Sequence, residues 1–73
     1  MTNTAALLDR IQRSGLKRSY IAENMGLSLG ALANKIANRS DFKAGEIDTL
    51  CSLLGIDSLE DKEAIFFASD VAE

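Results

Sequence analysis

The sequence predicts an all-α domain built from five short helices. Apolar residues recur every three or four positions along the 73-residue chain, which is the spacing of one helix face, and they do not alternate as in a half-buried strand. Glycine and asparagine fall between these periodic stretches, and the sequence contains no proline. Because a chain of this length buries only a thin core, we expect one compact domain over residues 1–73.

The first helix is expected over residues 4–14. Asn3 or Thr4 can cap its N-terminus through a side-chain oxygen. Gly15 follows the last periodic residue and can adopt the left-handed backbone conformation in which helices commonly end. The face expected to be buried carries Leu7, Leu8 and Ile11.

A second helix is expected over residues 18–25 and a third over residues 29–37, with a tight turn between them. Gly26 supplies the unusual backbone angle of the turn, and Ser28 caps the third helix. Asn38 is the next-best residue after glycine for a left-handed helix ending. The apolar positions expected to face the core are Ile21, Ala22, Met25, Leu27, Leu32 and Ile36.

The fourth helix is expected over residues 44–54 and is stopped by Gly55, after which Ile56 packs back beneath it. Phe42 is expected to anchor the loop before this helix. The apolar positions that mark the helix are Ile47, Leu50, Cys51 and Leu54.

A C-terminal helix is expected over residues 59–68. Ser58 and an acidic residue three positions later form an N-terminal cap pattern. Leu59 and Ile65 are expected to pack inward with one of the two adjacent phenylalanines, Phe66 and Phe67. Neighbouring helical residues point about 100° apart, so both rings cannot face the same core line. The other ring is open to a two-fold dimer contact, and residues 69–73 are expected to fray.

Residues 17–37 therefore predict a helix-turn-helix. Two short helices joined by a tight, glycine-containing turn present the second helix to the DNA major groove. Small Ala22 allows the two helices to cross closely, while the apolar positions hold the pair at one angle. The outer face of the third helix is then free to contact another molecule.

The stretch LKRSYIAENMGLSLGALANKI resembles the Cro/repressor-type (XRE-like) helix-turn-helix family of phage and bacterial regulators. The resemblance continues through NRSDF, EIDTLCSLLGI and IFFA, which look like small single-domain phage Cro-like regulators. It covers nearly the whole chain. It implies a lambda-repressor-like fold and a sequence-specific DNA-binding transcriptional regulator, a repressor that occludes a promoter.

The resemblance also implies roles for individual residues. Exposed positions early in the third helix would touch base edges: Ser28, Leu29, Gly30, Ala33 and Asn34. Residues flanking the helix pair would contact phosphates, with nearby basic residues added: Lys17, Arg18, Lys35, Asn38, Arg39 and Lys43.

Two of these positions depart from the family pattern, because Leu29 and Gly30 carry no polar side-chain group where relatives commonly donate hydrogen bonds to bases. Asn34 can still pair with adenine in a bidentate manner, and Leu29 can press on a thymine methyl group. We expect Asn34 to carry sequence preference and Arg39 to act on phosphates of any sequence. The remaining specificity would come from DNA shape or half-site spacing.

The charge distribution fits this prediction although the net charge is −3. Seven of the eight Lys and Arg residues lie within residues 10–43, whereas eight of the eleven Asp and Glu residues follow residue 43. The simplest alternative is that these charges only keep a small domain in solution. We expect the acidic half to suppress indiscriminate DNA binding.

The composition argues against other classes of site. The chain has no histidine and one cysteine, which removes the usual zinc spacings and most pairs of nucleophile and base. Cys51 lies in an apolar helical pattern and is expected to be a buried small hydrophobe. We expect no enzyme activity, no metal, no cofactor and no small-molecule ligand. Without a secretory pattern or an apolar run of about 20 residues, a cytoplasmic location and no membrane contact are expected.

The expected partner is a near-palindromic double-stranded DNA operator bound by a homodimer, whose third helices would lie about 34 Å apart. An alternative keeps the same fold but binds a protein, as an antirepressor or antitoxin-like module would. Leu29 and Gly30 favour this alternative because a smooth apolar helix face suits a protein groove. Arg18, Arg39 and Lys43 favour DNA.

Overall fold

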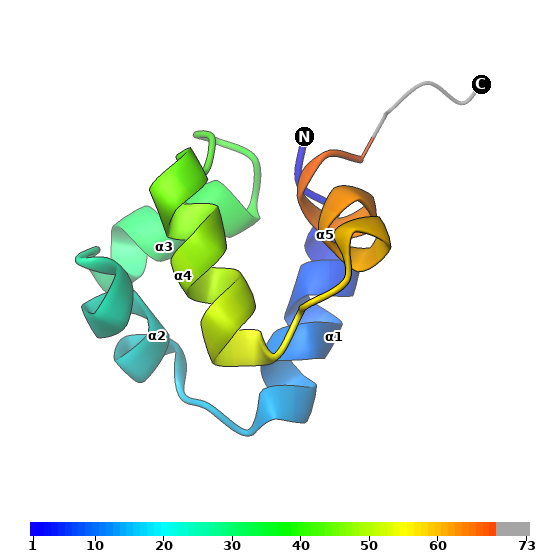
Figure 1. Ribbon diagram of the computed structural model, residues 1–73. Coiled ribbons are helices and arrows are strands. Elements are labelled where there is room, and N and C mark those ends of the chain that lie inside the picture. Colours follow the sequence, from blue (N-terminus) through cyan, green and yellow to red (C-terminus); the bar gives the residue numbers. More distant parts are fainter. Residues whose placement is uncertain (69–73) are drawn as a thin grey trace.

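Five helices lie within residues 1–68, the part of the chain that the computed structural model describes, and no strand occurs there. Helix α4 crosses the middle of the molecule, with α2 and α3 on one side and α1 and α5 on the other (Figure 1). The expected all-α class is confirmed, although α3 and α5 end one and two residues earlier than predicted. The bounds are α1 (Thr4–Ser14), α2 (Arg18–Met25), α3 (Leu29–Ile36), α4 (Ala44–Leu54) and α5 (Leu59–Phe66).

Side-chain caps explain where three of these helices begin. Asn3 Oδ1 accepts a hydrogen bond from the backbone N–H of Ala6 at 3.1 Å, which caps α1. Ser28 Oγ accepts from the Ala31 N–H at 3.0 Å, and Ser58 Oγ accepts from the Asp61 N–H at 3.0 Å. Each bond satisfies one of the free N–H groups at a helix start. The expected ends are also confirmed, with positive φ at Gly15, Gly26 and Gly55.

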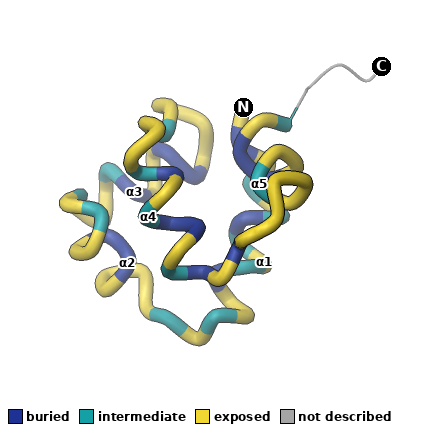
Figure 2. Tube along the Cα trace, in the orientation of Figure 1, coloured by how far each residue is buried: buried dark blue, intermediate teal, exposed yellow. Residues whose placement is uncertain are grey.

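One apolar core joins all five helices, and the buried stretches of each face the middle of the molecule (Figure 2). Leu7, Ile21, Leu32 and Leu50 are its most completely buried large side chains. Cys51 belongs to this core as expected, and burial raises the pKa of its thiol. Within residues 1–68 no helix is long and apolar enough to cross a membrane.

Helix α5 covers the core only with its last turn. Phe66 is buried and meets Phe42 edge-on, with ring centroids 5.7 Å apart, whereas Phe67 is 58% exposed. The expectation that Leu59 packs inward is wrong, because its side chain is 71% exposed. Leu59 is the first residue of α5 and lies more than one and a half turns before Ile65, beyond the part of the helix that reaches the core.

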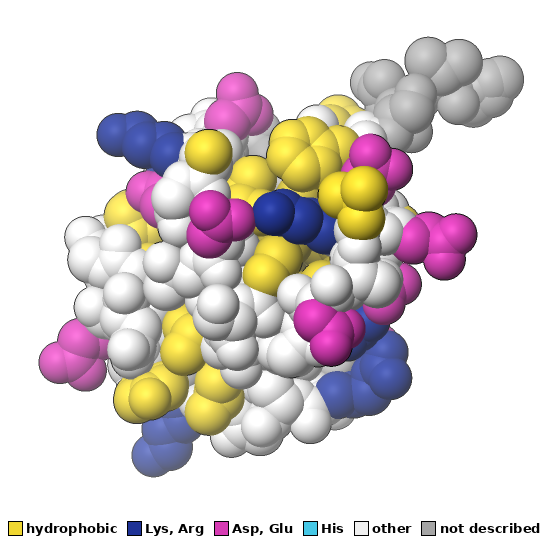
Figure 3. Space-filling view, viewed as in Figure 1, with side chains coloured by type: hydrophobic (Ala, Val, Ile, Leu, Met, Phe, Trp, Pro, Cys, Tyr) yellow, Lys and Arg dark blue, Asp and Glu magenta, His cyan; other side chains and the backbone are white. Residues whose placement is uncertain are grey.

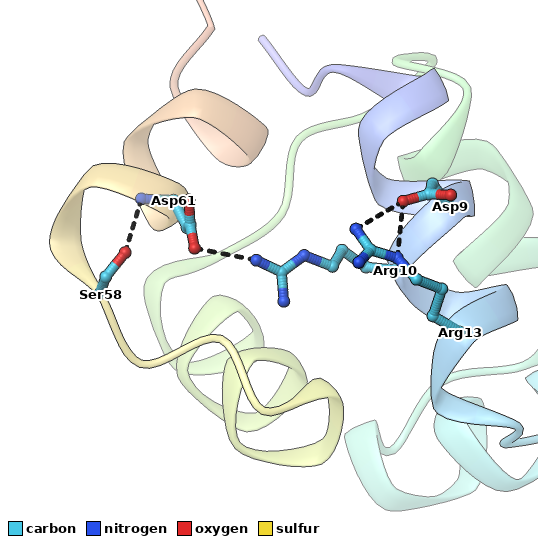
Figure 4. A network of polar contacts seen from close by, with 5 residues as sticks. All are labelled: Asp9, Arg10, Arg13, Ser58 and Asp61. Carbon is cyan, nitrogen blue, oxygen red and sulfur yellow. Dashed lines mark hydrogen bonds and ion pairs between the residues drawn. The ribbon is translucent and has the colours of Figure 1, made fainter.

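Polar contacts hold the two ends of α5 in place. Arg10 on α1 donates to Asp61 Oδ2 at 2.9 Å, so an ion pair fixes the first turn (Figure 4). At the other end, the Asn3 N–H donates to the Ile65 carbonyl at 2.6 Å and the Ala68 N–H donates to the Met1 carbonyl at 3.0 Å. The expected fraying of residues 69–73 lies outside the described residues.

Candidate nucleic-acid interface

Helix α3 has one buried and one exposed face. Leu32 and Ile36 point into the core, where at most 4% of either residue is exposed. The remaining face carries the exposed Asn34, and Leu29, the first residue of α3, lies at the edge of this face and is 55% exposed. Residues three and four positions apart lie on one side of a helix, so the exposed set forms one surface. All five residues predicted to touch bases are exposed: Ser28, Leu29, Gly30, Ala33 and Asn34.

Gly30 has no packing role within the fold. It lies in the first turn of α3, and a Cβ atom added there would meet nothing within 4 Å. Glycine lowers helix stability by about 1 kcal/mol relative to alanine, so this position keeps a residue that the helix does not favour. The absence of a side chain lets another molecule approach the α3 backbone closely.

The basic side chains of the described residues fall into two groups. Arg10, Arg13, Lys35 and Lys62 are each paired with a carboxylate at 2.8–3.1 Å. Four others form no ion pair within residues 1–68 and are exposed: Lys17, Arg18, Arg39 and Lys43. All four belong to the predicted phosphate set and lie in the sequence immediately before α2, at its start, or between α3 and α4.

Lys35 departs from the predicted phosphate role because its side chain turns inward. Only 11% of the side chain is exposed. Its ammonium Nζ donates to the Asp41 carbonyl at 2.9 Å and lies 3.0 Å from Glu46 Oε1. A phosphate contact would require Lys35 to leave both of these partners. The helical pattern places residue 35 beside the core, and its carboxylate partner, Glu46, comes from α4, which the α3 sequence does not reveal.

Glu46 joins the start of α4 to the end of α3. Its Oε1 accepts from the Lys43 backbone N–H at 2.9 Å as well as facing Lys35. The Lys43 N–H bond, followed by the Lys35 ammonium, lowers the pKa of the Glu46 carboxyl. The ion pair between Lys35 and Glu46 links α3 to α4, and the exposed face of α3 takes no part in it.

Asn38 adopts the left-handed conformation expected for it, with φ of 66°. Its Oδ1 accepts from the Thr2 N–H at 2.8 Å, and its Nδ2 donates to the Thr2 carbonyl at 2.8 Å. Nδ2 also lies 3.4 Å from the Thr4 hydroxyl. These internal partners occupy the side-chain donors, which leaves none for the predicted phosphate contact. The hydrogen bonds between Asn38 and Thr2 join residues 36 positions apart, so no local sequence pattern predicts them.

Replacing Asn38 separates the two contributions of this residue. Asn38→Gly retains easy access to positive φ but loses the amide bonds, and we expect it to lower the unfolding free energy by about 1–2 kcal/mol. Asn38→Ala loses the bonds and also strains the backbone, which should cost about 1–2 kcal/mol more. Urea unfolding of both variants measures the difference. Equal losses would show that the backbone conformation at this position is not strained for alanine.

The structure brings Asn34 and Arg39 into contact. Arg39 Nη1 donates to Asn34 Oδ1 at 3.1 Å, and the Arg39 backbone N–H donates to the Asn34 carbonyl at 2.8 Å. The sequence predicts separate tasks for these residues, one on bases and one on phosphates. Their direct contact does not support independent roles.

The face over α4 and α5 carries both acidic and basic side chains (Figure 3). Acidic side chains are spread over it, with basic ones in the middle and at the margins and hydrophobic areas between them (Figure 3). Arg10 and Lys62, the basic residues that contact this half, are each paired with a carboxylate there. The four cations that form no ion pair within residues 1–68 lie in the sequence at the start of α2 and after α3.

A comparison of the chain with protein-family models, curated proteins and solved structures finds no match. Residues 1–68 hold no group of three or more His, Cys, Asp or Glu side chains placed to bind a metal ion.

Proposed function

We propose that this protein is a sequence-specific DNA-binding transcriptional regulator of lambda-repressor-like fold that inserts α3 into the major groove. One observation carries the proposal: the four cations without a carboxylate partner in residues 1–68 all flank the helix pair whose outer face is exposed. A helix paired with another across a tight turn is a geometry that fits the groove. Repression would follow from occupying a site that overlaps a promoter.

The roles of the contacts differ in the proposal. Lys17, Arg18 and Lys43 neutralise phosphates and supply affinity for any sequence. Asn34 pairs with adenine and Leu29 covers a thymine methyl group, and one good bidentate contact discriminates by about 1–3 kcal/mol. Gly30 allows the α3 backbone to approach the base edges.

The net charge of −3 is compatible with DNA binding. At physiological salt, charges are screened over about 8 Å, so a phosphate responds mainly to nearby side chains. The carboxylates of α4 and α5 repel duplex DNA that approaches that face, which limits binding in wrong orientations.

The proposal includes a homodimer on a near-palindromic operator. Phe67 is 58% exposed and borders a hollow of about 290 Å³ that is also lined by Phe42 and Phe66. A projecting ring beside a recess suits a two-fold contact, in which each copy offers both parts. Analytical ultracentrifugation at micromolar concentration, with and without operator DNA, measures the oligomeric state. A complex that contains one protein copy on the operator would contradict the proposed homodimer.

Selection from a randomised duplex pool at near-physiological salt tests the function itself. We expect an enriched near-palindrome, and Arg18→Ala should weaken binding to all sequences. It should also lower the slope of log affinity against log salt by about 0.9 for each phosphate that is no longer neutralised. Arg13→Ala is the matched control, because it changes the net charge equally but removes a cation paired with Asp9.

The alternative is a protein-interaction module that uses the same surface. Its supporting observation is that Leu29 and Tyr20, on α3 and α2, are 55% and 48% exposed. If the folded protein enriches no duplex sequence, and if Arg18→Ala and Arg13→Ala behave alike, the DNA proposal fails and this alternative is favoured.

A further inference from the structure

We propose that Arg39 determines base recognition indirectly, as a positioning residue that fixes the side-chain amide of Asn34. The inference rests on the proposed function and changes the division of labour within it. Arg39 then influences which base is preferred as well as how tightly any DNA is held.

The turn after α3 brings the two residues together. Asn38 is left-handed, so the chain reverses and residue 39 lies beside residue 34. The Arg39 N–H donates to the Asn34 carbonyl at 2.8 Å, and the Asn38 N–H donates to the Lys35 carbonyl at 3.2 Å. These two bonds form the Schellman arrangement that commonly ends helices. Because Asn38 is also bonded to Thr2, the turn is held from outside the helix.

The guanidinium of Arg39 then selects one orientation of the Asn34 amide. A guanidinium has only donors, so the amide atom that faces it must be the oxygen. Nη1 lies 3.1 Å from Oδ1, which directs the Asn34 NH₂ group away from Arg39. Both residues are exposed, so this bond, and not packing, distinguishes the two ends of the amide.

A fixed amide matters because adenine is recognised by an ordered pair of contacts. The amide oxygen accepts from the adenine N6 group and the amide nitrogen donates to N7. A carbonyl oxygen has two lone pairs, so Oδ1 can keep its bond to Arg39 while it accepts from the base. Immobilising a flexible side chain on binding costs about 0.5–1.5 kcal/mol, equivalent to about 2-fold to 13-fold in affinity. Arg39 lowers this cost before DNA arrives.

The test compares Arg39→Ala with Arg18→Ala on the selected duplex and on duplexes changed at the position where Asn34→Ala abolishes preference. Arg18 is the matched control, because it is an exposed arginine with no ion pair within residues 1–68. Both variants should bind more weakly, but only Arg39→Ala should also reduce the preference for adenine, by about 2-fold to 13-fold. In an Asn34→Ala background, Arg39→Ala should leave the remaining preference unchanged, because the two effects share one contact.

A second measurement needs no DNA. In the free protein, Arg39→Ala should increase the fast motion of the Asn34 side-chain NH₂ group, measured by ¹⁵N relaxation, while Arg18→Ala should not. Unchanged Asn34 motion, or an equal loss of affinity on every duplex, would overturn the positioning role. If Asn34 is ordered by Arg39 but the wild-type protein enriches no duplex sequence, the proposed function fails instead, and with it any role of this contact in base recognition.

Discussion

Leu32→Ala is expected to lower the free energy of unfolding by about 2–5 kcal/mol, the largest effect we expect from a single substitution in α3. Leu32 is 1% exposed and joins the helix to the core, so its truncation leaves a cavity beneath α3. A domain of this size is stabilised by roughly 4–11 kcal/mol in total. Thermal unfolding followed by circular dichroism should show a melting temperature lowered by at least about 8 °C.

Leu29→Ala is the control for this experiment, because it makes the same chemical change three residues earlier, at the exposed start of the helix. Leu29 is 55% exposed, and its truncation should change the unfolding free energy by no more than about 0.5 kcal/mol. Under the proposed function its effect should appear in DNA binding, because alanine covers less of a thymine methyl group than leucine does. If Leu32→Ala lowered the unfolding free energy as little as Leu29→Ala does, the Leu32 side chain would not be part of the core.

Glu46→Gln is expected to destabilise the protein by about 1.5–3 kcal/mol at pH 7, the size of a hydrogen bond to a charged group. Glutamine keeps an oxygen that can accept from the Lys43 N–H, but it removes the negative charge beside the Lys35 ammonium. Only 11% of the Lys35 side chain is exposed. Urea unfolding measures the difference. Asp48→Asn is the control, since it breaks the exposed pair with Lys62, and the loss there should stay below about 1 kcal/mol.

This destabilisation should disappear in acid. The folded-state pKa of Glu46 is lowered from its ordinary value of 4.5, so the stabilisation by this carboxylate is complete above pH 4.5. It is lost as the pH falls through the folded-state pKa, because the proton then neutralises Glu46 in both states. The unfolding free energies of the wild type and Glu46→Gln should therefore converge below pH 4.5. A constant difference down to about pH 3 would contradict a stabilising role for the ionised carboxylate.

Helix positions could be predicted closely because their causes are local. Ser28 and Gly26 determine where α3 begins and α2 ends through interactions within four residues of each. The prediction weakened at α5, where Leu59 was expected to be buried and is exposed. Periodicity identifies an apolar position, but only the packing of α5 determines which of its turns reaches the core.

The candidate interface was predictable in its composition and not in its internal contacts. The exposed face of α3 follows from the helical spacing of Leu32 and Ile36. Lys35 is buried because it pairs with Glu46 on α4, and Arg39 contacts Asn34 across the turn that follows α3. The local sequence pattern predicts neither contact. Long polar side chains have many accessible conformations, so their place is decided by the neighbour that the fold supplies.

The sequence by itself determined the helical class, the five helix starts, the glycine ends of α1, α2 and α4, and the side of α3 that faces the core, because capping, glycine conformation and apolar spacing act over a few residues. Only the tertiary structure decided which cations of residues 1–68 remain without a carboxylate and how the polar groups at the end of α3 are joined. Those choices depend on residues far apart in the chain, such as Thr2 with Asn38 and Lys35 with Glu46, whose proximity arises only when the core has assembled.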